Sequence, residues 1–129
     1  MLDLAEIRPG EKVLEFGSGD GELVIRAAQK GAQAVGVEIN PLLVWYSRRR
    51  IRKLRLPSAK IIFGNFKKYP LSRANIIFMY LRPSTIAKIK EKLGKETSPG
   101  TRIVSNTFTI PGWKYILEKD KIFLYENGR

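Results

Sequence analysis

The feature that most constrains the fold of this chain is the stretch Glu11–Gly21, EKVLEFGSGDG. Within it, Val13–Phe16 is a short and largely apolar run, which predicts a buried β-strand. The run breaks at a glycine cluster, and residues 22–30 follow with apolar side chains on one side, which predicts a helix that Gly31 ends. Strand, glycine turn and helix in this order are typical of nucleotide-binding α/β proteins, because glycine lets a ligand approach the backbone and the helix start presents free N–H groups.

Two acidic residues beside this turn indicate the kind of ligand. Glu38 ends a second apolar strand, where a carboxylate can accept both hydroxyls of a ribose. Glu15 lies two positions before the first glycine, where it repels phosphate and suits an ammonium group. Glu22 stands where a dinucleotide site has its third glycine. A ligand made of adenosine and an amino acid, S-adenosylmethionine, meets these conditions, although such a glycine run also serves as a plain tight turn.

The same residues resemble the first two motifs of class I S-adenosylmethionine-dependent methyltransferases. Further segments resemble one branch of that superfamily, the small archaeal protein-lysine methyltransferases and their mitochondrial relatives, which act on an ATP synthase subunit and the adenine nucleotide carrier. These segments are AVGVEINPLLVWYSRRR (Ala34–Arg50), GNF (Gly64–Phe66) and GTRIVSNTFTIPGW (Gly100–Trp113). The resemblance covers roughly residues 8–126 and implies a three-layer α/β/α Rossmann-like fold. We expect a mostly parallel seven-stranded sheet with an antiparallel strand near the C-terminus, in one domain over residues 1–129.

The resemblance also implies which residues bind the cofactor. Glu15 would hold the ammonium group, directly or through water, and Glu38 the ribose. Ile39 and Phe66 would flank the adenine, and Asn65 would accept from its amino group; the alternative is that Asn65 only forms a turn and Phe66 only packs in the core. The expected cofactor-binding residues are Glu15, Gly17, Ser18, Gly19, Glu38, Ile39, Asn65 and Phe66.

Substrate residues are expected just past the apolar run Ala74–Tyr80, which reads as a strand buried on both faces. In an open parallel sheet this strand sits beside the first one, so Tyr80 and Leu81 should face the transferred methyl group. We expect Tyr80 to position the substrate and, with Trp113 from a Pro-Gly-Trp turn, to line an aromatic channel for lysine. The alternative is that Tyr80 only caps its strand.

Three further elements follow from cap and turn signals. Asn40-Pro41 is expected to begin one helix, and Ser84 is expected to cap another helix that runs through Leu93 and that Gly94 ends. Two final strands are expected to pair as a hairpin across Lys119-Asp120. The predicted buried face of the helix that starts at Pro41 consists of Val44, Ser47, Ile51 and Leu54.

Charge is distributed unevenly along the chain. Residues 1–47 carry a net charge of −3 and residues 48–129 carry +15, within a total of +12. The basic half is either a solvated surface or a surface for an acidic protein, nucleic acid or anionic lipid. The chain has no cysteine and no histidine, which excludes disulfides, thiolate chemistry, histidine acid–base chemistry and Cys/His metal sites, and we expect no metal.

The expected function is transfer of a methyl group from S-adenosylmethionine to a lysine amine of a protein substrate. Two alternatives remain: a nucleic-acid methyltransferase that uses the basic half, and an inactive module that only binds the cofactor. Absence of an Asn/Asp-Pro-Pro-aromatic motif at Tyr80–Pro83 argues against methylation of base amino groups. Family members carry more chain before the first strand, so we expect an open or partner-completed site. We also expect a cytoplasmic monomer without a signal peptide or a membrane-spanning segment.

Overall fold

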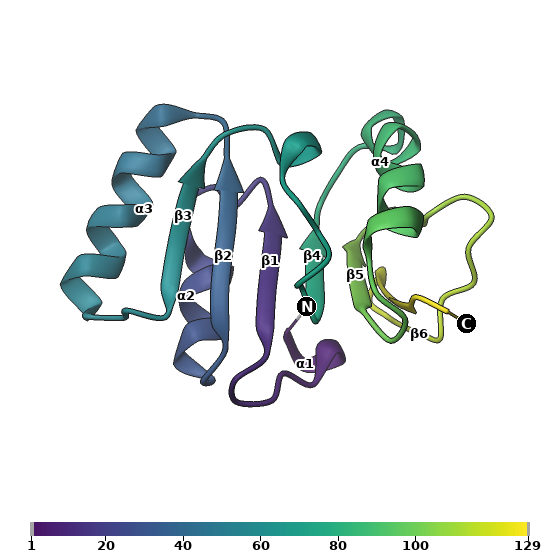
Figure 1. Cartoon of the computed structure of the whole chain (residues 1–129), viewed down its shortest axis with the longest axis horizontal. Coiled ribbons are helices and arrows are strands. Elements are labelled where there is room, and N and C mark those ends of the chain that lie inside the picture. Colours follow the sequence, from purple (N-terminus) through teal and green to yellow (C-terminus); the bar gives the residue numbers. More distant parts are fainter. Residues whose placement is uncertain (1, 129) are drawn as a thin grey trace.

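The computed structural model describes residues 2–128 and is built around one seven-stranded sheet with the order β3-β2-β1-β4-β5-β7-β6 (Figure 1). The strands are β1 Lys12–Phe16, β2 Gln33–Glu38, β3 Ala59–Phe63, β4 Ile76–Met79, β5 Arg102–Asn106, β6 Leu117–Lys119 and β7 Ile122–Glu126. The helices are α1 Leu2–Ala5, α2 Glu22–Gln29, α3 Pro41–Leu54, the 3₁₀ turn η1 Phe66–Lys68 and α4 Pro83–Glu96. Strands β1 to β5 are parallel, and β7 runs antiparallel to both β5 and β6, which confirms the expected sheet.

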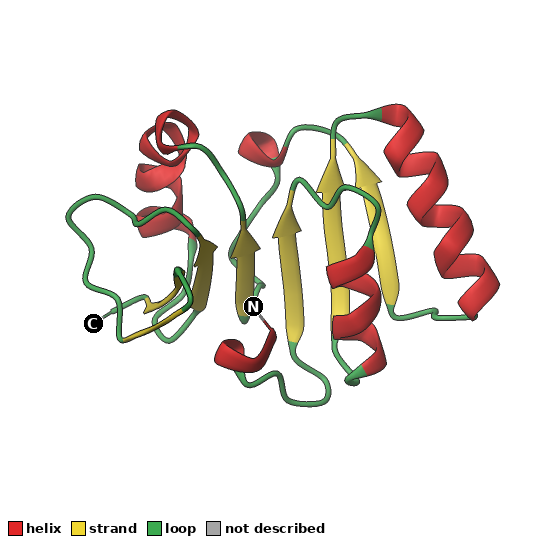
Figure 2. Ribbon diagram, turned by 180° about the vertical axis from the view of Figure 1, so that it is seen from behind, coloured by secondary structure: helices red, strands yellow, loops and turns green. Residues whose placement is uncertain are grey.

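Two apolar cores pack on the two faces of this sheet. One core joins α1, α2 and α3 to the sheet through side chains such as Ala5, Val24 and Val44. The other joins α4 to the sheet through Ile86 and Ile89. Figure 2 shows α1 and α2 in front of one face, whereas Figure 1 shows the other face with α4 at one side and no helix in front of β2 and β3. The second helical layer of the expected sandwich therefore covers only part of its face.

The start of α3 is as expected, but its end is not. Asn40 is the N-cap, and its Oδ1 accepts from the N–H of Leu42 at 3.0 Å, with Pro41 at the first helical position. Leu54, predicted to be buried, is 49% exposed. The helix ends in a left-handed residue at Arg55, and the next residue, Leu56, packs against the core in place of Leu54. The N–H groups of Arg55 and Leu56 satisfy the last carbonyl groups by donating to Arg52 and Ile51, and a hydrophobic contact commonly accompanies such a left-handed cap.

The boundaries of α4 and of the last hairpin also differ from expectation. Arg82 rather than Ser84 is the N-cap of α4, and the helix continues through Gly94 to Glu96. Ion pairs at i,i+4 spacing, including Lys92 with Glu96 at 2.7 Å, support this last turn. The hairpin turns at Asp120-Lys121, one residue later than predicted, and both residues have positive φ. Lys119 pairs with Ile122, which leaves Asp120 and Lys121 as the two turn residues.

The parallel strands bring the predicted site residues to one edge of the sheet. The glycine turn follows β1, Glu38 ends β2, Asn65 follows β3 and Tyr80 follows β4. Because these strands are neighbours, their carboxyl ends form a continuous rim, which is where ligands bind in open α/β sheets. Among residues 2–128, no helix is both long and apolar enough to cross a membrane.

The contact between β2 and the glycine turn predicts a sharp steric effect at Gly36. A Cβ at this position would lie 2.3 Å from the Cβ of Ser18 and 2.9 Å from Val24 Cγ2, so Gly36→Ala forces the turn away from the sheet. We expect a loss of unfolding free energy on the order of 1–3 kcal/mol, measured by urea unfolding. Gly94→Ala is the control, because its Cβ meets only Trp113 at 3.6 Å and should gain roughly 0.5–1 kcal/mol in the helix. Equal stability of the two variants would contradict this packing.

Candidate active site

The glycine turn after β1 leaves its backbone open on the side away from the protein. Gly17 and Gly19 have φ values of 69° and 58°, a conformation that side chains rarely allow. A Cβ added to either residue would meet nothing within 4 Å. The N–H of Gly17 donates to the carbonyl of Val37 at 2.8 Å, which fixes the turn against the end of β2. A ligand can therefore reach the main chain at these two glycines.

Glu38 links this turn to the next helix through both carboxylate oxygens. Its Oε1 accepts from the N–H of Gly19 at 2.7 Å, and its Oε2 accepts from the N–H of Asn40 at 3.0 Å. The side chain is only 8% exposed. A carboxylate has about four acceptor positions, so two remain for the ribose hydroxyls that the sequence predicts here. Glu38 thus shapes the turn as well as offering acceptors to a ligand.

Glu15 is a half-buried carboxyl group with one shielded oxygen that lacks a partner. It lies in β1 between Gly36 and Phe78, and among residues 2–128 its shielded Oε1 has no hydrogen-bond partner. Burial, reinforced by the charges of Asp20 and Glu38, raises the pKa of Glu15 to about 8. Such a group is unfavourable unless a cation pairs with it. An ammonium group, which the sequence predicts here, would supply such a cation.

Together these groups fit S-adenosylmethionine. The open glycines offer close approach for its methionine part, Glu15 an anion for its ammonium group and Glu38 acceptors for its ribose. The side chain of Ser18 has a different place, because it is 5% exposed and lies against Gly36, and its Oγ has no partner within the described chain. The main chain of Ser18 shapes the turn, because its N–H donates to the carbonyl of Val37 at 3.3 Å and its carbonyl accepts from the N–H of Gly21 at 3.0 Å.

The residues expected around the adenine lie at the correct edge but are partly engaged. Asn65 uses its Oδ1 to cap η1, accepting from the N–H of Lys67 at 2.9 Å, so one acceptor position remains. Phe66 stacks on Phe16 with ring centroids 4.8 Å apart, so one face of its ring belongs to the core. Ile39 is 66% exposed and available. All three residues lie at the rim, as the sequence predicts. The contacts that Asn65 and Phe66 already make within the protein were not predicted.

The expected substrate residues are not all brought together. Tyr80 is 66% exposed and follows β4, directly beside the glycine turn, and the partly buried Leu81 packs into the core near it. Trp113 instead lies next to Gly94 in the last turn of α4, whereas Tyr80 precedes the first turn. A helix of this length separates its ends by about 20 Å. The expectation that Trp113 and Tyr80 line one channel is therefore not met by their positions.

Helix α3 supports the glycine turn, a contact that is not apparent from the sequence. A Cβ at Gly21 would lie 2.8 Å from the Cβ of Ser47, so this glycine serves helix packing rather than a ligand. Arg50 donates from Nη1 to the carbonyl of Asp20 at 3.0 Å and from Nη2 to Glu22 at 2.7 Å. In the sequence, Arg50 is only one of several neighbouring cations. No local pattern distinguishes it from Arg49, because the contact joins segments far apart in the chain.

An open hollow of about 840 Å³ lies beside Glu15, between the glycine turn and the start of the chain. Its charged side chains include both signs, Asp20 and Glu22 facing Arg26 and Arg50. Within residues 2–128, no group of three or more acidic side chains is placed to hold a metal ion. Glu22, Arg26 and Arg50 in its wall are paired with one another, whereas Glu15 in the same wall has no ion pair within the described residues.

Replacing Glu15 by Gln should separate stability from binding. A carboxyl group whose pKa is raised by folding stabilises the fold fully below its unfolded pKa, near 4.5, and this contribution is lost as the pH rises to about 8. We therefore expect Glu15→Gln to resist urea better than the wild type at pH 9, with the difference vanishing near pH 4.5. The same substitution should weaken binding of S-adenosylmethionine, measured by calorimetry, because the ammonium group loses its anion.

The control for this prediction is Glu22→Gln, in the same hollow. Hydrogen bonds from Arg50 and Arg26 lower the pKa of Glu22, so its contribution to stability has the opposite sign. This variant should be less stable than the wild type at neutral pH and should approach it in acid. A Glu15→Gln protein that gains no stability at pH 9, or that keeps its affinity for the cofactor, would show that Glu15 is not an unpaired anion for the ligand.

Comparisons with known proteins agree with this geometry. Residues 15–116 match the family model described as ANTKMT methyltransferase domain. The chain is similar to a protein-lysine N-methyltransferase of Saccharolobus islandicus, at 38% identity over 88% of this chain and 72% of the relative. It is also similar to a human lysine N-methyltransferase of an ATP synthase subunit, at 37% identity over 78% of this chain but only 44% of the relative. The chain thus spans less than half of the human protein.

A solved structure is similar over almost the whole chain. It is an RNA methyltransferase from Salinibacter ruber in complex with S-adenosyl-L-homocysteine, with a TM-score of 0.89 and 32% identity, covering 98% of this chain and 85% of that one. It supports the Rossmann-like methyltransferase fold and the choice of cofactor. On the match over residues 15–116 and these relatives, the chain belongs to the ANTKMT methyltransferase domain family.

Proposed function

We propose that this protein uses S-adenosylmethionine to methylate the side-chain amine of lysine in a protein substrate. The observation that carries the proposal is the shielded, unpartnered oxygen of Glu15 at the end of β1, next to the open backbone of Gly17 and Gly19. The choice of lysine as the acceptor is supported by the protein-lysine methyltransferases among the relatives. The choice of cofactor is supported by the family and by the fit of the site to an ammonium group and a ribose.

In this proposal the protein mainly positions the cofactor and the acceptor amine and excludes water from them. Bound S-adenosylmethionine supplies a methyl group on a sulfonium, together with its own leaving group. Glu15 holds the ammonium end and Glu38 the ribose, so the two carboxylates fix the cofactor at two separate points. Tyr80, exposed beside the glycine turn, and Leu81 position the acceptor amine. Gly17 and Gly19 leave space for the methionine part.

The acceptor lysine must reach the site as a neutral amine, because an ammonium group has no lone pair to attack with. At pH 7 loss of its proton costs about 4–5 kcal/mol from a pKa near 10.4. The chain contains no histidine, so no imidazole takes this proton. We propose that the proton leaves to water before the amine enters, and that the nearby positive charge of the sulfonium disfavours the ammonium form.

A second candidate is methylation of RNA. It is favoured by the similarity to the Salinibacter ruber enzyme and by the net charge of +15 over residues 48–129. The lysine proposal is preferred because the relatives from Saccharolobus islandicus and human are lysine methyltransferases. For a protein substrate, the same basic half favours a partner with an acidic surface.

Labelled transfer into a cell lysate distinguishes these candidates. With methyl-labelled S-adenosylmethionine, we expect label in material that protease destroys and nuclease leaves intact. A Glu38→Ala variant is the control for cofactor-dependent transfer and should lose most of the label. Label that disappears with nuclease and survives protease would replace the lysine proposal by the RNA one, and absence of enzyme-dependent label in either fraction would contradict both.

The pH dependence of transfer tests the identity of the acceptor. If deprotonation of lysine is an equilibrium before transfer, the single-turnover rate at low substrate concentration should rise about tenfold per pH unit from roughly pH 7 to 9. A ribose hydroxyl or a ring nitrogen does not titrate in this range, so its profile should be nearly flat. Circular dichroism across the same range establishes that the protein stays folded. A flat profile with the best protein substrate would argue against a lysine acceptor.

A further inference from the structure

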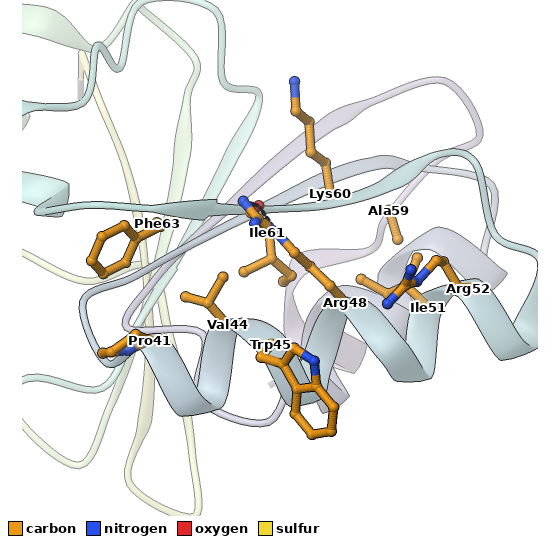
Figure 3. A pocket seen from close by; sticks show the side chains of 10 residues that line it. All are labelled: Pro41, Val44, Trp45, Arg48, Ile51, Arg52, Ala59, Lys60, Ile61 and Phe63. Atoms are coloured by element: carbon orange, nitrogen blue, oxygen red, sulfur yellow. Dashed lines mark hydrogen bonds between the residues drawn. The ribbon is translucent and has the colours of Figure 1, made fainter.

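A groove outside the candidate active site runs between α3 and the edge strand β3. Its volume is about 750 Å³ (Figure 3). Val44, Ile51 and Ile61 form an aliphatic floor, and these side chains are at most 8% exposed. The rim carries large aromatic and cationic side chains, among them Trp45 and Arg52. We call this feature the α3–β3 groove.

The groove lies within a stretch of unusual charge. Residues 39–90 contain thirteen Lys and Arg and no Asp or Glu. Arg52 on the rim has no acidic partner among residues 2–128, and the same holds for Lys53 in α3 and for Arg55 at its C-cap. These cations are not neutralised within the described chain, so the surface around the groove attracts anions.

Large apolar side chains are exposed at the same place. Trp45 is 56% exposed and Phe63 is 58% exposed, and both line the groove. Trp45 also carries the guanidinium of Arg49 at 5.6 Å from its ring centroid. Exposed tryptophan and arginine beside an aliphatic hollow are the residues that dominate binding energy in protein interfaces. The groove thus has the composition of a docking surface.

Arg48 divides the groove into two parts. Its side chain crosses from α3 to β3, where Nε and Nη2 donate to the carbonyl of Ile61 at 3.1 and 2.9 Å (Figure 3). Its Nη1 makes no hydrogen bond within the described residues, so it is left for an external acceptor. On one side of Arg48 lie Pro41, Val44 and Phe63, and on the other lies Ile51 with Arg52.

We propose that the α3–β3 groove docks an acidic segment of the protein substrate that carries apolar anchor side chains. The aliphatic floor calls for an apolar side chain on either side of Arg48, and the free cations of Arg48 and Arg52 call for carboxylates beside it. A nucleic-acid strand matches the charge and the aromatic rings, but it has no aliphatic side chain to insert against the floor of Val44, Ile51 and Ile61. The composition of the floor therefore favours a polypeptide.

The position of the groove suits a docking site that is separate from the acceptor lysine. Pro41 and Phe63, at one end of the groove, adjoin the carboxyl ends of β2 and β3 and so the adenine side of the candidate active site. Tyr80 lies farther along the same rim, two strands away from β2. One substrate can thus occupy both places. This assignment of substrate class rests on the proposed function.

A binding experiment with matched variants tests the groove directly. The probe is a short fluorescein-labelled peptide of glutamate and leucine, followed by anisotropy with the whole protein. Trp45→Ser/Arg52→Ser removes one aromatic and one cation that line the groove. Tyr46→Ser/Lys53→Ser removes the same kinds of side chain from the next positions of α3, where Tyr46 is 48% exposed and neither residue lines the groove. Thermal melts check that both proteins are folded.

We expect the groove variant to lose at least about tenfold in affinity for the peptide and the control variant to lose less than about threefold. A peptide of glutamate alone should bind more weakly than the glutamate–leucine peptide. Equal losses of affinity in the two variants would show that the peptide binds through general surface charge and not in the groove, and would overturn the proposal. The proposal is also overturned if the peptide does not bind, or if oligouridylate displaces it at a lower concentration than unlabelled peptide does.

Steady-state methylation of the labelled protein substrate separates docking from chemistry. For that substrate, the groove variant should raise KM about tenfold with kcat unchanged, and the control variant should change neither. An unchanged KM in the groove variant would contradict a docking role for the substrate. If no protein is methylated while the two variants still differ in peptide binding, the proposed function fails and the docking surface stands, so the two failures are distinguishable.

Discussion

The carboxylate of Glu38 is the contact on which the site depends most. One oxygen holds the N–H of Gly19 and the other holds the N–H of Asn40. A single buried side chain thus ties the loop after β1 to the start of α3. Arg50 returns from α3 to the carbonyl of Asp20 and closes this connection. The glycine loop is consequently held in one conformation by β2, Glu38 and α3 together.

Glu15 shows the opposite situation, a group that the fold does not satisfy. A shielded carboxyl oxygen without a hydrogen-bond partner is unfavourable. Such groups persist at functional positions, where a bound ligand supplies the missing partner. Two acids thus stand in neighbouring strands with different roles. Glu38 is hydrogen-bonded to the protein through both oxygens and stays an acceptor, whereas Glu15 lacks a cation. The distinction follows from hydrogen bonding alone.

Much of this architecture could be predicted because it is local. Neighbouring residues alone indicate the strand–glycine–helix order, the Asn40-Pro41 cap and the apolar run of β4. Contacts between distant segments could not be predicted, such as Arg50 on the glycine turn or Trp113 on α4. The exposure of Leu54 also depends on tertiary structure, since the left-handed turn at Arg55 decides which leucine faces the core.

The bridge from Arg48 to the carbonyl of Ile61 also bears on self-association. Strand β3 forms one border of the sheet, and an uncovered border of this kind can recruit a strand from another molecule and seed aggregates. A second chain would have to displace a charged guanidinium from the acceptor it needs, against the repulsion between two molecules of net charge +12. The opposite border, β6, spans only Leu117–Lys119, too short to serve as a template. Both borders of the sheet are thus protected from edge-to-edge polymerisation.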